Sequence, residues 1–138
     1  MDLFTYGTLQ FEDVWSRVAG APLPTVGARV DGYAVYRVGG YEFPGMTAET
    51  GAVAVGTVYL GVEERALAAL DAFEGEFYER VRVQAACADS IQRACDAYVI
   101  PPAKSPLLTA EPWAAERFLA DGGLTRFLAR YTGFRKRD

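Results

Sequence analysis

Segments with strand-like and helix-like patterns follow one another irregularly along the chain, and this order limits the folds that the sequence can adopt. Runs rich in β-branched and aromatic residues predict strands, and apolar residues three or four positions apart predict helices. The predicted strands are a short run within residues 1–9 and residues 26–30, 32–38, 52–60, 77–85 and 93–100. The predicted helices are residues 10–19, 63–74, 113–119 and 124–131. Because these segments do not repeat as βαβ units, the sequence predicts an α+β fold rather than a doubly wound parallel sheet.

Three of the predicted strands carry a clearer pattern than the others. Residues 52–60 are nearly all apolar, which predicts a central strand. Residues 77–85 alternate between apolar and charged side chains, as in a half-exposed strand, and residues 93–100 follow as its partner. Glycine and proline at 20–24, 39–40 and 44–45 predict loops and turns between the elements.

The length and charge of the chain restrict its organisation and its partners. A chain of 138 residues is expected to form one domain, spanning residues 1–138, that buries about two thirds of its unfolded surface. The net charge of −4 argues against a general nucleic-acid-binding protein. The basic ending, Arg130 and residues 135–137, is expected to be a solvated tail.

The chain contains no histidine, and this absence excludes several kinds of active site. Ser-His-Asp and Cys-His catalytic sites and histidine-bearing metal sites are not available. The two cysteines, Cys87 and Cys95, are too few for a four-sulfur zinc site. No phosphate-binding glycine motif is present, so we expect neither a metal nor another cofactor. Any acid–base chemistry must then use a carboxylate, a tyrosine or a lysine.

The expected location of the protein is the cytoplasm. The chain starts without a basic stretch followed by an apolar region, so no secretory signal is predicted. The apolar run at 52–62 is too short to span a bilayer, so no membrane association is expected. Cys87 and Cys95 could face each other across a hairpin, although two free thiols in a reducing compartment are the favoured interpretation.

Glu74 is the best-placed candidate for a catalytic acid or base. Leu67, Leu70 and Glu74 are three and four residues apart and therefore share one face of the predicted helix. Gly75 is a natural helix stop, so Glu74 would be the last helical residue. Partial burial and the negative end of the helix dipole would both raise the pKa of the Glu74 carboxyl group. The alternative is a solvated glutamate at a frayed helix end.

A second candidate site lies near the start of the chain, in the segment Tyr6-Gly7-Thr8-Leu9. A strand that stops at a glycine and leads into a helix leaves several backbone N–H groups unpaired and pointing to one place. Such a corner can bind an anion. As a lone pattern it is weak, because many corners of this kind bind nothing.

Together, the two segments resemble the γ-glutamylcyclotransferase-like family, including its γ-glutamylamine and plant defence-induced branches. The family pattern combines an N-terminal Tyr-Gly-(Thr/Ser)-Leu segment with a later Leu-Asp-x-(Phe/Tyr)-Glu-Gly segment that ends in Tyr-x-Arg. Residues 6–9, 70–75 and 78–80 match it here. Residues 31–33 and 41–45 are also similar to the family's Gly-Tyr strand and Tyr/Phe-Pro loop. The resemblance covers roughly residues 2–100 and leaves residues 101–138 as a helical extension.

The resemblance implies a fold, a reaction and a set of site residues. The fold is a mixed, partly closed β-barrel-like sheet with flanking helices. The reaction is an acyltransferase-type cyclisation of a small γ-glutamyl amide or amine, which releases 5-oxoproline and a free amine without a cofactor. Glu74 would be the general acid and base, and the amides of Gly7, Thr8 and Leu9 would hold the substrate. Tyr6 and Tyr78 are candidate walls of the substrate cavity, with a purely structural aromatic as the alternative for each.

Three interpretations stay open at this point. The chain could be a cyclotransferase, it could remove a γ-glutamyl protecting group in a biosynthetic pathway, or it could be a non-catalytic module that binds a small molecule or a partner through the same cavity. Arg80 is expected to form a structural ion pair with Asp71 rather than to bind a ligand. The wall facing the leaving group is expected to come from residues 41–46 and from the segment after Ile100.

Overall fold

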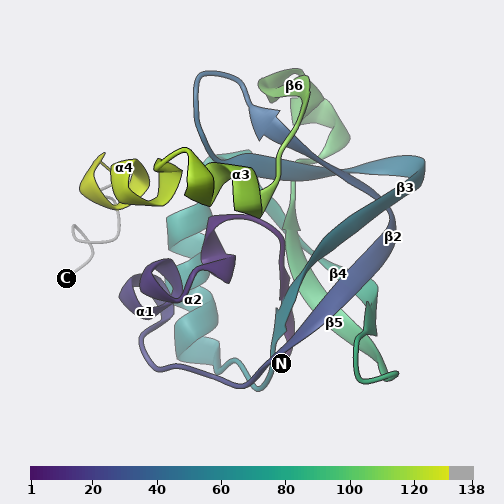
Figure 1. Cartoon of the computed structure of the whole chain (residues 1–138). Coiled ribbons are helices and arrows are strands. Elements are labelled where there is room, and N and C mark those ends of the chain that lie inside the picture. The colour runs from purple at the N-terminus through teal and green to yellow at the C-terminus, as the bar shows by residue number, and fades with distance from the viewer. Residues whose placement is uncertain (131–138) are drawn as a thin grey trace.

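The computed structural model of the chain describes residues 1–130 and shows a closed β-barrel with helices along one side (Figure 1). Its strands are β1 (Leu3–Thr5), β2 (Thr25–Val38), β3 (Pro44–Tyr59), β4 (Glu79–Cys87), β5 (Gln92–Val99) and β6 (Leu108–Pro112). The barrel order is β3-β1-β5-β4-β2, and pairing of β2 with β3 closes the ring. Strand β6 pairs with the far end of β2, at Tyr36 and Val38, beyond the part of β2 that pairs with β4. The predicted α+β barrel with flanking helices is therefore confirmed.

The barrel is mixed, because its strands do not all run in the same sense. Strand β1 pairs with β5 in parallel, whereas the other pairings within residues 1–130 are antiparallel. Strand β1 has three residues and lies between β3 and β5, so both of its edges are covered. The chain leaves β1 at one end of the barrel, and residues 6–9 follow directly from this end.

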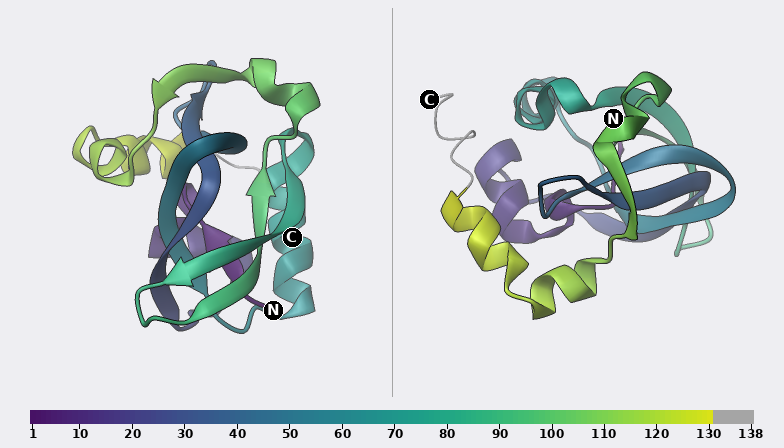
Figure 2. Two further views of the ribbon diagram at one scale, coloured as in Figure 1. Left: turned by 90° about the vertical axis from the view of Figure 1, so that its right-hand side faces the viewer. Right: turned by 90° about the horizontal axis from the view of Figure 1, so that it is seen from above.

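Strands β2 and β3 form a long antiparallel ribbon that is strongly curved (Figure 2). The prediction of two separate strands at 26–30 and 32–38 is wrong, because one strand runs through both. The pairing with β3 shifts register between Asp31 and Tyr33, and Gly32 there has a φ of +85° that favours glycine. The predicted turn at Pro44-Gly45 is also wrong, because both residues belong to β3. Strand β3 lies between β1 and β2, so the prediction of a central strand at 52–60 holds for residues 57–59, which pair on both edges, whereas Val55 is 71% exposed.

The helices and shorter 3-10 turns connect these strands. They are η1 (Thr8–Gln10), α1 (Glu12–Ala19), α2 (Glu64–Glu74), η2 (Gly75–Phe77), η3 (Pro102–Leu107), α3 (Ala115–Ala120) and α4 (Gly123–Arg130). Helices α1 and α2 contact each other beside the barrel, and α3 and α4 lie above them in the view of Figure 1. The predicted helix at 10–19 begins at Glu12, after the 3-10 turn. Residue 131 and the basic tail at 135–137 lie outside the described residues.

The apolar side chains form two clusters on opposite faces of the barrel wall. Alternation along β1 sends Leu3 toward the helices and Phe4 into the barrel interior. The outer cluster joins Leu3 with side chains of α1 and α2, including Trp15, Leu67 and Leu70. This packing fixes α2 against the barrel and so sets the position of its last residue, Glu74.

Cys87 and Cys95 are both buried as free thiols in the barrel interior. In the β4–β5 register Cys95 pairs with Val83, and Cys87 pairs with Ala28 of β2. The two cysteines are therefore not cross-strand partners. No helix within residues 1–130 is long and apolar enough to cross a membrane.

Candidate active site

A cavity of about 520 Å³ opens where the end of α2 approaches the turn after β1. Its walls come from five parts of the chain: the end of β1 with the turn after it, the segment from β2 into the start of β3, the end of α2 with the residues that follow it, one residue of β5 and one of α4. The lining residues are Phe4, Thr5, Tyr6, Gly7, Thr8, Leu9, Gly40, Tyr41, Glu42, Phe43, Pro44, Ala72, Phe73, Glu74, Gly75, Glu76, Phe77, Tyr78, Tyr98 and Phe127. All six residues that the sequence assigned to the site are among them.

Glu74 is the last residue of α2, as the sequence predicts. The helix begins after Glu63, and Gly75 ends it with a φ of +70°, donating its N–H to the Asp71 carbonyl oxygen. Leu67 and Leu70 on the same helix face are buried, which turns Glu74 toward the cavity. The helix stop thus places the carboxylate at the cavity wall.

The carboxyl group of Glu74 has a strongly altered proton affinity. The residue as a whole is half-buried, but its carboxyl group is enclosed by protein, and this desolvation raises its pKa from 4.5 to about 8. Within residues 1–130 the structure gives this carboxylate no hydrogen-bond or ion-pair partner. An acid with these surroundings exchanges its proton near neutral pH, as general acid–base chemistry requires.

The turn after β1 faces Glu74 across the same cavity. Tyr6, Thr8 and Leu9 are buried, with exposures of 7%, 7% and 4%. The N–H groups of Gln10 and Phe11 bond back to the carbonyl oxygens of Gly7 and Thr8, which forms the 3-10 turn η1. The N–H groups of Thr8 and Leu9, in the first turn, therefore have no partner within η1. Both residues line the cavity.

Gly7 has a packing reason to be glycine. A Cβ atom at this position would lie 2.7 Å from the Pro44 Cγ atom, closer than side chains approach one another. The φ of Gly7 is −124°, so the close approach rather than the backbone angle excludes a side chain. Gly7 and Pro44 together hold the turn against the start of β3.

The hydroxyls of Tyr6 and Tyr78 are both used within the protein. The Tyr6 hydroxyl donates to the Tyr98 carbonyl oxygen at 2.6 Å and accepts from the Met46 N–H at 3.1 Å. Its burial and the nearby Glu74 carboxylate raise the pKa of Tyr6 well above its usual value. The Tyr78 hydroxyl donates to the Pro44 carbonyl oxygen at 2.6 Å. Each tyrosine therefore lines the cavity and also braces β3.

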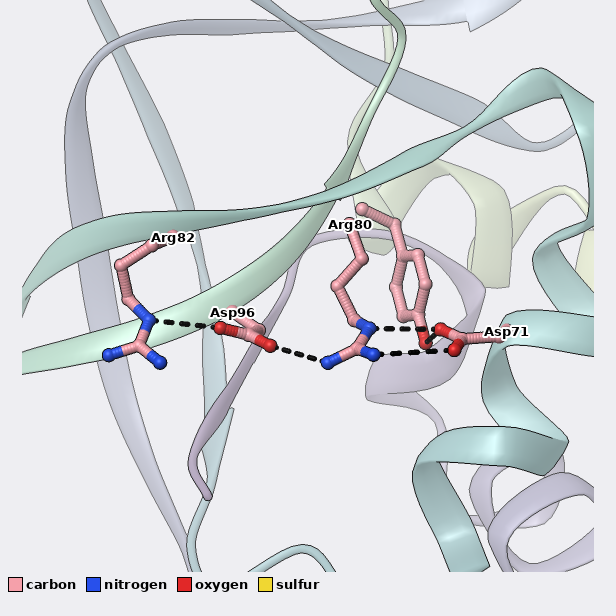
Figure 3. A network of polar contacts seen from close by, with 5 residues as sticks. Asp71, Arg80, Arg82 and Asp96 are labelled. Carbon is pink, nitrogen blue, oxygen red and sulfur yellow. Dashed lines mark hydrogen bonds and ion pairs between the residues drawn. The ribbon is translucent and has the colours of Figure 1, made fainter. Parts of the chain in front are cut away.

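Arg80 forms the predicted ion pair with Asp71 and extends it into a network (Figure 3). Its Nε atom is 3.0 Å from Asp71 Oδ1, and its Nη1 atom is 2.6 Å from Asp96 Oδ2. Asp96 also accepts from Arg82 Nε at 3.0 Å, and Tyr98 donates its hydroxyl to Asp71 at 2.6 Å. The network ties α2 to β4 and β5 one helical turn before Glu74. Arg80 does not line the main cavity, although it lines a smaller hollow beside Glu74.

The sequence model of the family described as "Gamma-glutamyl cyclotransferase, AIG2-like" matches residues 3–115. The chain belongs to this family. The matched range includes the Tyr6–Leu9 turn, Glu74 and the Arg80 network, and it ends where α3 begins.

Solved structures of similar proteins support the family fold. The Arabidopsis thaliana protein At5g39720.1 is 26% identical and has a TM-score of 0.72, over 99% of this chain and 92% of that one. A second protein of this plant, At3g28950.1, is 27% identical with a TM-score of 0.73, over 99% and 80%. An AIG2-like protein from Mus musculus is 21% identical with a TM-score of 0.61, over 83% and 88%, and shows the fold alone. Comparison with curated protein sequences gives no match.

Two parts of the cavity wall lie outside the Tyr6–Leu9 turn and the segment around Glu74. An aromatic cluster of Tyr41, Phe43 and Phe77 forms one wall, and Phe127 of α4 contributes from the C-terminal segment. Residues 41–44 and a residue after Ile100 therefore do line the cavity. The resemblance of residues 41–45 to the family's Tyr/Phe-Pro loop was the available signal for the first of these parts. No group of three or more metal-binding side chains occurs in the part of the chain that the structure describes.

Proposed function

We propose that the protein is a γ-glutamylcyclotransferase that acts on a small γ-glutamyl amide or amine and releases 5-oxoproline and a free amine. One observation carries this proposal: the desolvated Glu74 carboxyl group, with its pKa raised to about 8, lies in the same cavity as the Tyr6–Leu9 turn. Membership of the family supports the class of reaction. The residue roles below are part of the proposal.

The reaction is a cyclisation in which the substrate supplies its own nucleophile. The α-amine nitrogen attacks the γ-carbonyl carbon, a new C–N bond closes the five-membered lactam, and the original amide C–N bond breaks. The proton lost by the attacking amine is returned to the leaving amine. No electrons are gained or lost overall, so the balance needs no redox partner.

Glu74 is the group that we assign to this proton transfer. Its carboxylate takes the proton from the attacking amine, and the resulting carboxylic acid delivers it to the departing nitrogen. General acid–base catalysis of this kind contributes about 10² to 10⁴ in rate. A pKa of about 8 leaves both forms of Glu74 populated near neutral pH, so neither half of the cycle is blocked.

Positioning of the substrate is the other contribution. Holding an intramolecular nucleophile in attack geometry lowers the barrier by about 7–11 kcal/mol. In the proposed complex the N–H groups of Gly7, Thr8 and Leu9 hold the substrate's α-carboxylate or polarise its γ-carbonyl. No lysine or arginine lines the cavity among residues 1–130, so backbone donors are the available partners for an anion.

Substitution of Glu74 tests the assignment. Glu74→Gln keeps the size of the side chain but cannot transfer a proton, so we expect kcat for 5-oxoproline release to fall by about 10² or more while ligand affinity is kept. The matched control is Glu64→Gln, at the exposed start of the same helix and away from the cavity. Near-normal turnover by Glu74→Gln would show that the assignment is wrong.

The identity of the products separates the open alternatives. Release of 5-oxoproline with an amine identifies a cyclotransferase, whereas release of free glutamate identifies hydrolytic removal of a γ-glutamyl group. Binding of γ-glutamyl compounds without either product identifies a binding module.

A further inference from the structure

Part of the cavity wall is a cluster of three aromatic rings, Tyr41, Phe43 and Phe77. The centroid of the Tyr41 ring is 4.7 Å from that of Phe43 and 5.8 Å from that of Phe77. Phe43 and Phe77 are 6.4 Å apart. Tyr41 is 48% exposed, although tyrosine rings gain stability from burial, so the wall presents open aromatic surface to whatever enters the cavity.

The charged side chains of the cavity are all acidic within residues 1–130. They are Glu42, Glu74 and Glu76, and no lysine or arginine joins them. Among the described residues several cations lie next to lining residues but are engaged. Arg126 Nη2 is 2.6 Å from Glu42 Oε1, and Lys104 Nζ donates to the Glu76 carbonyl oxygen. Arg80, in the smaller hollow beside Glu74, is paired with Asp71 and Asp96. Among residues 1–130 the cavity therefore has backbone donors for one carboxylate, at the Tyr6–Leu9 turn, and no cationic side chain in its lining for a second.

We propose that the cavity selects γ-glutamyl amides whose leaving amine carries an aromatic ring and no carboxylate. The inference rests on the proposed function and names its substrate class. With the α-carboxylate at the turn and the scissile amide at Glu74, the leaving group extends along Phe77, which follows Glu74 by three residues in η2. The aromatic ring of the leaving amine packs against Tyr41, Phe43 and Phe77.

A carboxylate on the leaving group is disfavoured for two physical reasons. It would lose water against an aromatic wall without gaining a cationic partner from the lining that residues 1–130 provide. It would also approach the like charge of Glu76, which is exposed and lines the same cavity. An uncharged ring loses no such hydration and gains aromatic contacts.

The direct test compares three substrates by the rate of 5-oxoproline release: γ-glutamyl-2-phenylethylamide, γ-glutamyl-phenylalanine and γ-glutamyl-ethylamide. The first two differ only in a carboxylate, and the first and third only in the ring. We expect kcat/KM for the phenylethylamide to exceed that for the other two by about tenfold or more. Equal values within either pair would overturn the proposal.

Variants of the wall separate the aromatic subsite from the rest of the cavity. Because Tyr41 is half exposed, Tyr41→Ala should fold, and we expect it to raise KM for the phenylethylamide about three- to tenfold with kcat unchanged. KM for the ethylamide should stay within about twofold. Tyr36→Ala is the matched control, since this β2 tyrosine bonds to Glu49 and does not line the cavity. An equal effect of Tyr41→Ala on both amides would contradict the subsite.

The engaged lysine offers a further check. If Lys104 bound a substrate carboxylate, Lys104→Ala would selectively lower kcat/KM for γ-glutamyl-phenylalanine. This result would overturn the exclusion of carboxylates. We expect the ranking of the three substrates to be the same in Lys104→Ala as in the wild type.

Calorimetric binding to Glu74→Gln distinguishes failure of this inference from failure of the proposed function. Turnover of the three amides without the expected ranking overturns the substrate class and leaves the cyclotransferase. Tighter binding of the phenylethylamide, with no 5-oxoproline from the wild type, overturns the reaction and supports the subsite. If the wild type turns over none of the amides and Glu74→Gln binds none of them, both the reaction and the substrate class are overturned.

Discussion

Asp71 and Glu74 lie one turn apart at the end of α2, and their carboxylates have opposite surroundings. Asp71 accepts hydrogen bonds from Arg80 and from the Tyr98 hydroxyl, and 45% of its side chain is exposed to solvent. Glu74 is enclosed, and burial alone raises its pKa to about 8. Charge pairing therefore serves the structure at one position, while the acid three residues later has no ion-pair partner among residues 1–130 and is the one to which we assign proton transfer.

The raised pKa of Glu74 makes stability depend on pH. In the unfolded chain this carboxyl group ionises near 4.5, and in the folded protein near 8. Between these values the folded state holds more protons, so the free energy of unfolding falls as pH rises and levels off above about 8. The cost of ionising Glu74 in the folded protein is on the order of 5 kcal/mol. Glu74→Gln should therefore stabilise the protein relative to the wild type at about pH 8.5 and much less at about pH 5.

Urea unfolding of the wild type and Glu74→Gln across this pH range measures the effect. The difference between the two proteins isolates Glu74 from other groups that titrate. Glu64→Gln, with its side chain exposed at the start of the helix, should show no such pH-dependent difference. A difference that stays constant from about pH 5 to 8.5 would mean that Glu74 ionises normally.

The Tyr6 hydroxyl is expected to act through structure. In Tyr6→Phe the Tyr98 carbonyl and the Met46 N–H both lose a buried partner. Loss of these contacts should lower the free energy of unfolding by about 1–3 kcal/mol, as seen by urea denaturation. Tyr33→Phe is a suitable control, because this half-buried tyrosine packs on the barrel cluster without a hydrogen bond in the described structure. An unchanged unfolding midpoint for Tyr6→Phe would show that water replaces the hydroxyl.

Asp96 is the acid on which the network most depends. Only 10% of its side chain is exposed, and it accepts from both Arg80 and Arg82. Asp96→Asn leaves two guanidinium groups facing an uncharged amide, so we expect a loss of about 2–3 kcal/mol in the free energy of unfolding. The comparison is Asp89→Asn, which removes the charge of a carboxylate that is 40% exposed in its pair with Arg93 and should shift the urea midpoint less. Equal shifts for the two variants would argue that the network is not buried enough to matter.

Local patterns predicted the end of α2 well and the extent of β3 poorly. The apolar face of α2 and the glycine after it are adjacent in sequence, so Glu74 could be placed at the helix end. The first half of β3 is not predicted, because residues 47–51 are half-buried or exposed. These residues pair with β2 through their backbone and show no alternation of apolar and polar side chains. The short edge strand β6, which pairs with β2, was missed for the same reason.

The candidate site also has features that the sequence predicted and features that it did not. The motif segments could be found because each is continuous in sequence, and Arg80 could be paired with Asp71 because only nine residues separate them. The Tyr98 bond to Asp71 and the support of Pro44 by Tyr78 join residues 27 and 34 positions apart. Such contacts depend on strand order and register, which no local pattern in this chain encodes.

The contact between Gly7 and Pro44 connects this support to activity. Gly7→Ala would place a Cβ atom 2.7 Å from Pro44 Cγ, so the turn or the proline must move. Pro44 also accepts the Tyr78 hydroxyl bond, and its displacement would therefore disturb two walls of the cavity. Because a shift of about 1 Å can lower a rate by about 10², we expect kcat/KM for 5-oxoproline release to fall at least about tenfold.

Gly27→Ala is the matched comparison, because its Cβ would lie 4.0 Å from Ala88 Cβ, at ordinary contact distance. This exposed β2 position should keep wild-type kcat/KM and a wild-type urea midpoint. If Gly7→Ala turned over like Gly27→Ala, the turn would tolerate displacement, and its backbone donors could not be the groups that position the substrate. A loss confined to Gly7→Ala, with the fold retained by circular dichroism, would instead link the geometry of the turn to the reaction, as the proposed role of Gly7, Thr8 and Leu9 requires.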